Sequence, residues 1–386
     1  MKYRKFGKLD FEVSTFGMGC MRMPQEERAD GTKGFDHKES IRMIHRAIEG
    51  GVNYFDTANA YGADGECEKV LGEALAIGGR REGVKIATKI SPRLCTSEDA
   101  IREVFEEECR RLQTNYIDFY LIHQLDEGER YGYMVDYDIL STFEKLKAEG
   151  RIKHIGFSYH GNYENWKRCL DYYDGWEMAQ PQFNILDINR QASVEGIRYA
   201  GKKGVPVVVM EPLKGGNLAE VPPEIQAMYD SFPVKRTPVE WGFAFVADYP
   251  EIACILSGVS TMDQLEDNLR IFSELEANSL TKEEMDFIYS INAAYDKMIP
   301  VPCTGCRYCV PCPAGVDIPG IFSLYNSASL SGGHFEEYKG SYNRIAMGRS
   351  GGKAADACVA CGACERECPQ GIPIIEKLKE AHAALG

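Results

Sequence analysis

Cysteines gather in two short runs near the C-terminus of this 386-residue chain. Eight of its fourteen cysteines lie there, four ahead of Pro313 and four ahead of Pro369: Cys303, Cys306, Cys309, Cys312, Cys358, Cys361, Cys364 and Cys368. The second run has the C-x2-C-x2-C-x3-C-P spacing with which thiolates hold iron–sulfur clusters, the fourth thiolate often serving the other cluster of a pair. The two runs therefore predict two [4Fe–4S] clusters.

The two ligand sets are expected to exchange their fourth cysteine, because a ligand close behind a tight three-cysteine loop cannot easily turn back onto the same cluster. The sets are then Cys303, Cys306 and Cys309 with Cys368, and Cys358, Cys361 and Cys364 with Cys312. The first run has two residues before its last cysteine where the second has three. This difference leaves the exchange open, whereas cluster binding is predicted either way.

Disulfides and structural zinc are the alternative interpretations of the cysteine runs. Residues 1–10 are polar and lack the apolar stretch of a signal peptide, so secretion and disulfides are not expected. Zinc sites usually take two separated pairs of ligands, not four evenly spaced cysteines closed by a proline. The other six cysteines show no ligand spacing and are expected to be ordinary small buried residues.

A second set of chemically capable residues lies in the first half of the chain. Asp56, Lys89 and His123 each follow a short apolar run, and Tyr61 comes shortly after Asp56. A lysine beside a tyrosine lowers the pKa of the phenol, and a carboxylate paired with the lysine keeps it charged and aimed. Tyr61 would be the general acid, while His123 would donate a hydrogen bond to a substrate carbonyl oxygen. Each residue alone has a common structural role, so the prediction depends on their joint placement.

The elements that must position these residues alternate between short apolar strands and helices. The expected strands cover residues 15–18, 52–55, 84–88, 116–122, 152–157, 177–179, 205–210 and 254–256. The expected helices include residues 38–49, 66–76, 97–112, 137–149, 192–203, 238–248 and 262–272. Eight such units in about 300 residues predict an α/β fold, a TIM (β/α)8 barrel with its chemistry at the C-terminal ends of the strands. No Gly-x-Gly-x-x-Gly follows an early strand, which disfavours an open dinucleotide-binding sheet.

Other segments complete the expected organisation. Residues 3–13 are predicted to form a hairpin that closes the barrel bottom. Residues 124–136, rich in charge and glycine, are long for a connection between a strand and a helix and are expected to form either a loop that shapes specificity or a mobile surface segment. The chain changes character near residue 295, which predicts a barrel domain over residues 1–295 and a small domain over residues 296–386. Within the small domain, 45 residues separate the cysteine runs, and helical patterning covers residues 318–330, 335–347 and 374–384. It resembles a helical ferredoxin-like domain more than the compact βαββαβ ferredoxin.

Composition excludes several classes of partner. The net charge of −14 argues against nucleic acid, whose phosphates require a basic face. No apolar stretch approaches the roughly 20 residues that a membrane span needs, so no membrane is expected. Hydrophobic content of 44% and charged content of 26% are typical of a globular protein. Thiolate-bound clusters are sensitive to oxidation, which favours a reducing cytoplasm.

At Asp56, Tyr61, Lys89 and His123 the chain resembles the aldo-keto reductases, whose Asp, Tyr, Lys and His tetrad these residues match. The resemblance covers about residues 1–294, and the motif Phe-Asp-Thr-Ala-x-x-Tyr-Gly that starts at Phe55 is specific. With its cysteine-rich tail the chain is similar to the iron–sulfur aldo-keto reductases of bacteria. The resemblance implies an NAD(P)-dependent oxidoreductase that uses NADPH or NADH on a small-molecule carbonyl or alcohol.

The same resemblance implies the contacts of the nicotinamide cofactor. Two residues match positions that hold the carboxamide, residues 211–218 match the pyrophosphate loop, and residues 258–268 match the adenosine-phosphate segment. The implied cofactor-binding residues are Ser158, Gln180, Met210, Glu211, Pro212, Leu213, Lys214, Gly258, Gln264, Asp267 and Asn268.

Several of these positions depart from the family pattern. Met210 replaces the tyrosine that stacks on the nicotinamide, and Tyr159 replaces an asparagine. Gly258 and Gln264 stand where NADPH-specific members carry lysine and arginine, which removes charge-assisted contacts to a 2′-phosphate. NADH is therefore expected to serve as well as NADPH, unless binding is weak or Lys214 or Arg270 compensates.

Three functional hypotheses follow. The first is hydride transfer between NAD(P)H and a carbonyl or alcohol, with clusters that are structural or regulatory. The second is an electron-transfer oxidoreductase in which the clusters exchange electrons with the barrel site through a flavin or a redox partner protein such as a ferredoxin. Hydride carries two electrons as a pair whereas a cluster accepts one, and the chain shows no flavin motif, so the first is preferred. The third, a binding or sensor module with a barrel site that has lost its activity, is disfavoured by the intact tetrad.

His160, near Ser158, is an additional candidate for substrate contact.

Overall fold

The structure is a computed structural model that describes residues 1–386 except 29–30, 32, 126–128, 304, 306–307, 331–333, 349–351 and 369–370. The predicted cluster ligand Cys306 therefore lies outside the described residues. The chain divides into two compact units. The first contains Met1–Gly215 and Glu240–Met285, and the second contains Gly216–Val239 and Asp286–Gly386. The boundary expected at residue 295 remains a prediction.

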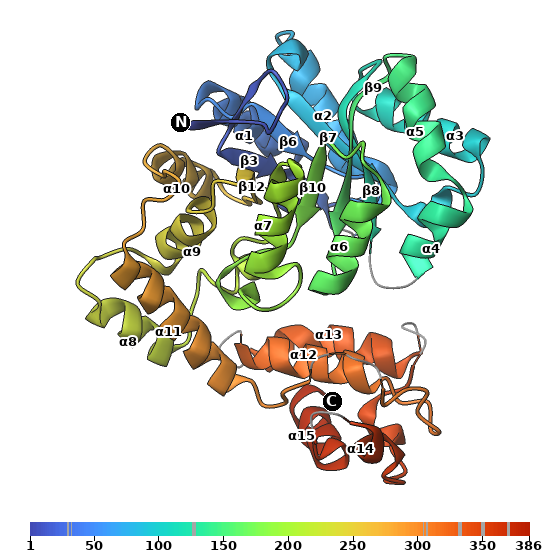
Figure 1. The fold of residues 1–386 in the computed structure, drawn as a ribbon, viewed down its shortest axis with the longest axis vertical. Helices are drawn as coiled ribbons and strands as arrows, with labels where there is room; N and C mark the ends of the chain where they lie inside the picture. The colour runs from blue at the N-terminus through green and yellow to red at the C-terminus, as the bar shows by residue number, and fades with distance from the viewer. Residues whose placement is uncertain are drawn as a thin grey trace. The chain divides into compact units, whose positions relative to one another are not determined.

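The first unit is built on a closed barrel of eight parallel strands, which confirms the predicted TIM barrel (Figure 1). Neighbouring strands follow the order β10-β11-β12-β3-β6-β7-β8-β9. Their bounds are β3 Phe16–Gly19, β6 Tyr54–Asp56, β7 Lys85–Ile90, β8 Ile117–Leu125, β9 Ile152–Tyr159, β10 Met178–Pro181, β11 Val207–Val209 and β12 Ile252–Ser257. Nearly every strand residue is buried. This is expected for the parallel strands of a barrel, because one face of each strand packs against side chains inside the barrel and the other face packs against the surrounding helices.

The N-terminal hairpin fills the end of the barrel where the strands begin. Strands β1 (Tyr3–Lys5) and β2 (Glu12–Ser14) pair antiparallel, as predicted. Phe6, between them, packs against the ring of Phe119 at 4.9 Å between centroids and belongs to the same apolar cluster as Met178 and Leu256. Burial of these rings closes one end of the barrel, which leaves the opposite end for chemistry.

Helices surround the strands in the first unit (Figure 1). They are α1 His37–Glu49, α2 Glu66–Ala76, α3 Glu98–Arg111, α4 Glu129–Asp136, α5 Ile139–Ala148, α6 Tyr163–Tyr172, α7 Ser193–Lys203 and α10 Met262–Phe272, with α9 Pro238–Ala247 spanning the boundary of the units. Side-chain caps begin several of them: Asp36 accepts a hydrogen bond from Glu39 N at 2.9 Å, and Ser97 from Ala100 N at 3.1 Å. Helix α4 corrects the expectation of a continuous loop over residues 124–136, because Tyr131 and Met134 on this helix are buried.

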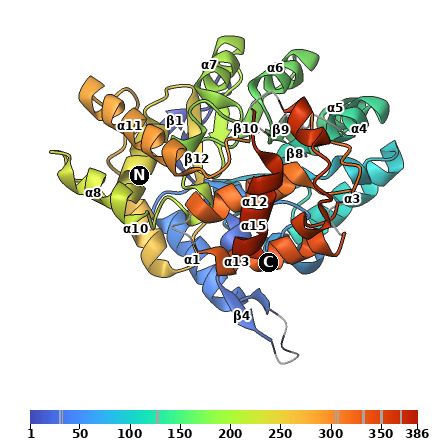
Figure 2. The ribbon, with the colours of Figure 1, turned by 90° about the horizontal axis from the view of Figure 1, so that it is seen from below.

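A second hairpin lies between β3 and α1. Its strands are β4 (Gln25–Glu27) and β5 (Lys33–Phe35), which pair antiparallel with Gln25 opposite Phe35. Figure 2 shows β4 extending outward from the barrel. Phe35 is buried while the β4 residues are exposed, so only the returning strand contributes to the core.

The second unit is helical, which confirms the predicted class of the C-terminal region. It contains α8 Pro223–Ser231, most of α11 Lys282–Met298, and then α12 Ile318–Leu330, α13 Phe335–Ala346, α14 Ala363–Glu367 and α15 Ile374–Leu385. Near α8, Phe232 stacks on Phe287 of α11 at 4.2 Å between ring centroids. Helices α12, α13 and α15 pack around an apolar cluster that includes Phe322, Tyr342 and Leu378.

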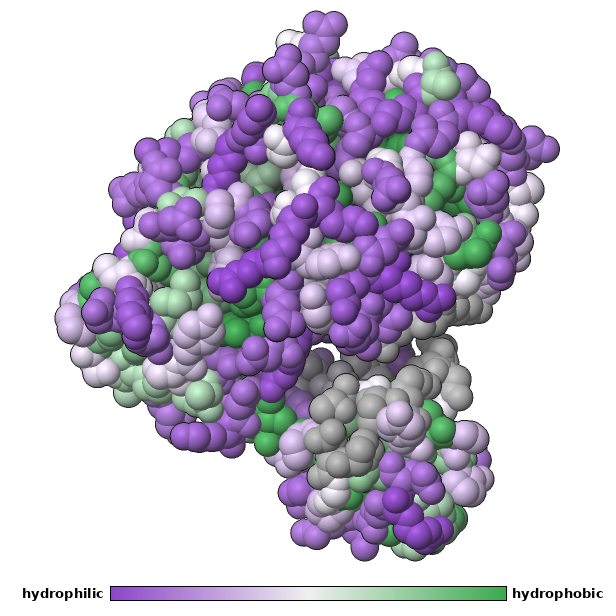
Figure 3. All heavy atoms as spheres, in the orientation of Figure 1, coloured by the Kyte–Doolittle hydropathy of each residue, from purple (hydrophilic) through white to green (hydrophobic). Residues whose placement is uncertain are grey.

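Polar side chains dominate the molecular face drawn in Figure 3. Throughout the described part of the chain, no helix combines the length and apolarity that crossing a bilayer requires.

Candidate active site

The four residues of the predicted tetrad come from three neighbouring strands. Asp56 is the last residue of β6, Lys89 lies near the end of β7 and His123 near the end of β8, while Tyr61 lies in the loop after β6. Strand β7 pairs with both β6 and β8, which brings the C-terminal ends of all three together. This is the barrel end where catalytic residues of the fold are expected.

Lys89 is the centre of the polar contacts in this group. Its Nζ donates to Asp56 Oδ1 at 2.6 Å, to the backbone oxygen of Thr57 at 2.7 Å and to the Tyr61 hydroxyl at 3.5 Å. Its side chain is fully buried, so the ammonium lies in a region of low dielectric where such contacts are strong. The rings of Tyr61 and His123 meet edge to face, 5.7 Å apart between centroids. The structure therefore brings all four residues together.

Lys89 and Asp56 form an ion pair whose mutual attraction opposes the effect of burial on both charges. Burial lowers the pKa of Lys89, but the Asp56 carboxylate and the Tyr61 hydroxyl together raise the pKa above its ordinary value. Burial raises the pKa of Asp56, and the Lys89 ammonium counteracts that rise. The lysine is thus a fixed cation that points toward the tyrosine.

The pKa of Tyr61 corrects one detail of the sequence argument. Burial raises the pKa of the phenol, and the Lys89 ammonium, which lowers it, offsets only part of that rise. The net shift is upward from the ordinary value, whereas the presence of lysine predicted a decrease. The reason is that partial burial of the phenol disfavours its anion more than the lysine favours it. Tyr61 is therefore held in the protonated form, the form a proton donor requires.

His123 is held neutral. Burial lowers the pKa of its imidazole to about 2, and the nearby Lys89 charge acts in the same direction. A neutral imidazole keeps one N–H that can donate a hydrogen bond, which is the role predicted for it. His160, the additional candidate, lies in the loop after β9, where its backbone N–H donates to Leu125 O at 3.0 Å. Burial also lowers the pKa of His160.

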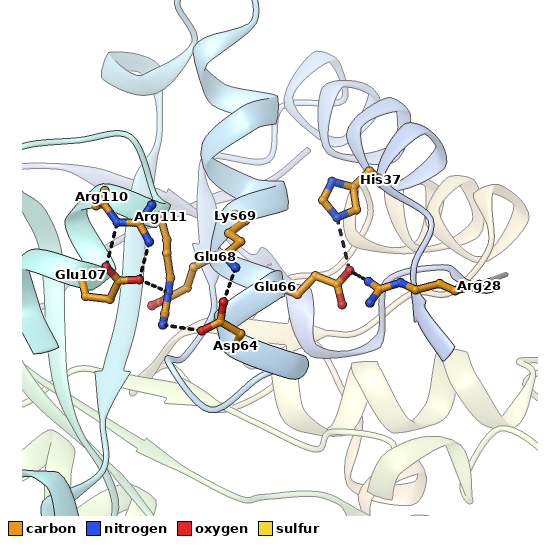
Figure 4. Close-up of polar contacts among 9 residues, drawn as sticks. All are labelled: Arg28, His37, Asp64, Glu66, Glu68, Lys69, Glu107, Arg110 and Arg111. Atoms are coloured by element: carbon orange, nitrogen blue, oxygen red, sulfur yellow. Dashed lines mark hydrogen bonds and ion pairs between the residues drawn. The ribbon is translucent and has the colours of Figure 1, made fainter. Parts of the chain in front are cut away.

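A network of ion pairs supports the loop that carries Tyr61 (Figure 4). Asp64, just after Tyr61, accepts from Lys69 at 2.6 Å and from Arg111 of α3 at 3.3 Å. Two residues further on, Glu66 pairs with Arg28 and lies 3.4 Å from His37. These contacts join the loop to α1, α2, α3 and the β4–β5 hairpin, so the tyrosine is held from several sides.

Ser158 and Gln180, expected to bind a nicotinamide carboxamide, lie side by side on β9 and β10. The two residues are opposite each other in the strand pairing, and each is 1% exposed. Ser158 Oγ accepts a hydrogen bond from Gln124 N at 2.8 Å. Gln180 Oε1 is buried and has no hydrogen-bond partner among the described residues. An amide oxygen in that state suits an incoming N–H donor such as a carboxamide, because a buried unpaired acceptor is costly.

The predicted pyrophosphate segment follows β11 at the same barrel end. Met210 is half-buried and its N–H donates to Pro181 O at 3.0 Å. Glu211 adopts a positive φ of 54° and its carbonyl accepts from Asn184 Nδ2 at 3.0 Å. Pro212 and Leu213 continue the turn, and Lys214 Nζ pairs with Asp187 at 3.4 Å.

The predicted adenosine-phosphate segment follows β12. Gly258 is exposed directly after the strand, and the other three residues lie on α10. Asn268 Nδ2 donates to Ser257 Oγ at 2.9 Å, Gln264 Oε1 accepts from Ser260 N at 2.8 Å, and Asp267 pairs with Arg270 at 2.7 Å. All the predicted cofactor residues therefore lie on β9 or β10 or follow β11 or β12, although their roles remain predictions.

Sequence reasoning missed a buried polar group that braces the pyrophosphate segment. Asp187 Oδ2 accepts from Gln182 Nε2 and from Asn184 Nδ2, each at 2.7 Å. Since Asp187 also pairs with Lys214, it links the turn after β10 to the turn after β11. In the sequence these side chains appear only as three separate polar residues within residues 182–187. That pattern alone does not show that they share hydrogen bonds.

The described cluster cysteines gather around one small core in the second unit. Cys364 is part of the apolar cluster, Cys361 is exposed, and the others pack against the cluster as half-buried residues: Cys303, Cys309, Cys312, Cys358 and Cys368. In the described ranges, no three histidine, cysteine, aspartate or glutamate side chains are close enough to hold a single metal ion. The donor set itself, thiolates beside apolar side chains, fits iron–sulfur clusters.

Comparison with known proteins gives two family matches. Residues 15–293 match the Aldo/keto reductase family, and residues 302–372 match a 4Fe-4S dicluster domain. The uncharacterized oxidoreductase YqkF of Bacillus subtilis is 26% identical over 320 residues, which cover 75% of this chain and 96% of that protein. The 6-dehydroglucose reductase of Novosphingobium aromaticivorans is 27% identical over 56% of this chain and 70% of its own length. The structure of aldo-keto reductase AKR11C1 from Bacillus halodurans in its holo form matches with a TM-score of 0.62 at 29% identity, over 75% of this chain and 96% of that one.

Proposed function

Because the chain belongs to the aldo/keto reductase family and ends in a 4Fe-4S dicluster domain, we propose that it transfers hydride between NAD(P)H and a small-molecule carbonyl or alcohol. The observation that carries the proposal is the buried Lys89 ammonium, within hydrogen-bonding distance of both Asp56 and the Tyr61 hydroxyl. The family establishes an oxidoreductase of the aldo-keto reductase type, and the proposal adds the reaction and the roles of the residues.

In the reduction direction, a nicotinamide cofactor held by residues such as Ser158 and Gln180 would supply hydride for the carbonyl carbon. Tyr61 donates its hydroxyl proton to the carbonyl oxygen, whose electron pair accepts it as the C=O double bond becomes single. Lys89 stabilises the phenolate that Tyr61 becomes, and Asp56 keeps Lys89 charged and aimed. His123, neutral and adjacent to Tyr61, donates a hydrogen bond that positions the same oxygen. Proton transfer from a positioned acid of this kind contributes about 10²–10⁴ in rate.

We further propose that Ser158 and Gln180 hold the carboxamide of the cofactor. Support comes from the burial of both side chains, their adjacency on β9 and β10, and the unpaired Gln180 Oε1 among the described residues. The absence of lysine and arginine at Gly258 and Gln264 supports acceptance of NADH as well as NADPH.

The clusters are proposed to be two [4Fe–4S] groups with a structural or regulatory role, held by a domain over residues 296–386. A hydride moves its two electrons as a pair, so no one-electron carrier is needed for the barrel chemistry. The sensitivity of such clusters to oxidation supports a location in the reducing cytoplasm.

Replacement of Tyr61 by phenylalanine tests the proposal. The protein is purified without oxygen and assayed with a panel of aldehydes, ketones and alcohols, using NADH and NADPH. Tyr61→Phe should reduce kcat by about 10²–10⁴ while the cofactor still binds, because only the transferred proton is lost. Tyr289→Phe, which removes a hydroxyl from a 41% exposed tyrosine, is the matched control and should leave turnover unchanged. Full turnover by Tyr61→Phe would refute the assignment of the acid.

A further inference from the structure

The chain passes from the first compact unit to the second within the predicted pyrophosphate segment, residues 211–218. The boundary between the units falls between Gly215 and Gly216. These two glycines have φ angles of 68° and 105°, a region of backbone conformation that favours glycine, so the chain turns sharply at this point. The segment therefore begins in the unit that contains the barrel and ends in the unit that contains the cysteine runs.

The beginning of the segment is fixed by contacts inside the first unit. The carbonyl oxygen of Glu211 accepts a hydrogen bond from Asn184 Nδ2 at 3.0 Å. Lys214 Nζ pairs with the buried Asp187 at 3.4 Å. These contacts hold residues 211–214, the part of the segment for which cofactor contacts are predicted.

The end of the segment is fixed by contacts inside the second unit. Asn217 Nδ2 donates a hydrogen bond to the hydroxyl of Tyr338 on α13 at 3.2 Å, and both side chains are half-buried. Leu218, the next residue, is 1% exposed. The chain then stays in this unit, where the ring of Tyr229 on α8 meets that of Phe287 on α11 at 5.8 Å between centroids. The end of the segment is thus tied to the second unit by a side chain as well as by the backbone.

Tyr338 also packs on the core around which the cluster cysteines gather. Its ring lies against the apolar cluster that includes Phe322 and Tyr342. Cysteines of both runs, such as Cys309 and Cys368, pack against the same cluster. Because a bound metal centre contributes to the folding of the residues that hold it, this core is most firmly ordered when iron–sulfur clusters are bound. The position of the Tyr338 hydroxyl then depends on cluster binding.

We propose that the hydrogen bond between Asn217 and Tyr338 couples cluster binding to cofactor affinity, an inference that rests on the proposed NAD(P)-dependent function. With the clusters bound, the bond holds the end of the segment, so less conformational freedom is lost when the cofactor binds. Tyr338 is a positioning residue, since it acts on the segment through Asn217. The coupling is reciprocal, because a cofactor that prefers the ordered segment stabilises the ordered second unit. The clusters thereby gain a regulatory role that passes no electrons to the barrel.

Titration of the anaerobically purified full-length protein with NADH and NADPH, in the absence of substrate, tests the first direction of the coupling. Tyr338→Phe keeps the ring on the apolar cluster and removes the hydroxyl, so Kd for both cofactors should rise about three- to tenfold, the scale of one hydrogen bond. Asn217→Ala should give the same rise, and the double variant should give no more than either single one. Tyr325→Phe on α12, which packs on the same cluster, is the matched control and should bind as the wild type does.

Release of cluster iron to an anaerobic chelator, followed by visible absorbance, tests the reverse direction. Saturating NAD⁺ or NADP⁺ is used, because neither can donate electrons to the clusters. Bound cofactor should slow iron release from the wild type several-fold, and this protection should be lost in Tyr338→Phe and in Asn217→Ala. A purely structural role of the hydroxyl would instead change the rate of release equally with and without cofactor.

The failure of this coupling and the failure of the proposed function give different results. A wild-type protein that binds neither NADH nor NADPH would refute the proposed function. Unchanged Kd values in both single variants, with wild-type iron content and thermal unfolding, would refute the coupling alone. Additive losses in the double variant would show that the two residues do not act through one bond. If Tyr338→Phe loses iron, Asn217→Ala decides, since its Kd must still rise for the coupling to stand.

Discussion

The protonation states of the four clustered side chains are set by burial as much as by charge. Tyr61 is kept protonated because burial outweighs the effect of Lys89 on its pKa, and His123 is kept neutral by burial and by the same lysine. Lys89 remains a cation because Asp56 is 2.6 Å away. Each residue is therefore in the form that the proposed reduction uses, without a proton transfer to prepare it.

These protonation states predict a flat pH profile for carbonyl reduction. The pKa of Tyr61 lies above its ordinary value near 10, so the acid does not ionise below about pH 10. The pKa of His123 is about 2, so its neutral form persists far below the ordinary value near 6.5. The value of kcat should therefore be constant from about pH 6 to pH 9 in anaerobic steady-state assays.

A decline of kcat that follows a single group with a pKa near 6.5 would contradict the neutral, buried state of His123.

The depressed pKa of His123 also affects the stability of the fold, in a direction that can be stated. The unfolded chain binds a proton at His123 from about pH 6.5 downward, whereas the folded chain does not. His123 therefore stabilises the fold above this pH, and its contribution is lost as the pH falls.

Helix α3 carries the clearest unused titratable group at the scale of elements. Glu108 lies on the face of α3 that packs into the first unit and is fully buried. Neither of its carboxylate oxygens has a hydrogen-bond partner among the described residues. Burial, and next the nearby Glu68, raise the pKa of Glu108 well above its ordinary value. The helix therefore packs best while this carboxyl group holds its proton.

Glu108→Gln should stabilise the protein more at pH 8 than at pH 5. Because the folded pKa is raised, the stability that Glu108 contributes is complete below about pH 4.3 and is lost as the pH rises through the folded pKa. Glutamine does not ionise, so the variant should gain stability relative to the wild type at pH 8 and gain less at pH 5. The midpoint of thermal unfolding at several pH values measures the difference.

Glu103→Gln, on the exposed face of the same helix, is the control and should change stability little at either pH. A Glu108→Gln variant whose gain does not grow with pH would show that this carboxyl group is not ionised at a cost in the folded protein.

The sequence predicted most elements because burial leaves a strong pattern. All eight barrel strands were located, since apolar runs such as that of β8 have almost no exposed residue, and α2 and α10 were placed with their observed bounds. Helix α4 was missed because charged residues and glycine make up half of its sequence, and only tertiary burial of Met134 and Tyr131 makes it part of the core. Local composition does not reveal such contacts.

The tetrad was identified from strand ends, but the properties of individual side chains were not. Glu108 stands in a run of three glutamates, and nothing in that run distinguishes the buried one from its exposed neighbours. The net shift of the pKa of Tyr61 likewise depends on how completely the ring is buried.

The whole molecule combines a barrel of the aldo/keto reductase family with a helical unit rich in cysteines. Described cysteines of both runs pack on one apolar cluster, which includes Phe322, Tyr342 and Leu378. Cluster binding would therefore add cross-links to a core that is small by the standard of a domain, where metal centres often supply stability. The barrel has a much larger core of its own.

Cys361→Ser should lower the iron content by about half, because one three-cysteine run loses a ligand while the other stays complete. The variant should also make residues after 300 more sensitive to limited proteolysis, since cluster binding contributes to their folding. Reduction of carbonyls by the barrel should persist if the clusters are structural. Iron analysis of anaerobically purified protein, together with its visible absorbance, measures the first effect.

Cys169→Ala is the control for iron content, because this cysteine is buried in α6, far from either run in sequence. It should retain the iron of the wild type. Full iron in Cys361→Ser would show that the ligand assignment is wrong, whereas loss of barrel activity together with iron would favour participation of the clusters in turnover.

The closing contacts of the barrel impose an order on its synthesis. Strand β3 pairs with β12, and Arg4 in the N-terminal hairpin donates to the carbonyl oxygens of Ala247 and Ile252, at 2.5 and 2.7 Å. These partners leave the ribosome more than 240 residues after Arg4 does. These two hydrogen bonds of Arg4 and the pairing of β3 with β12 can therefore form only after translation has passed β12.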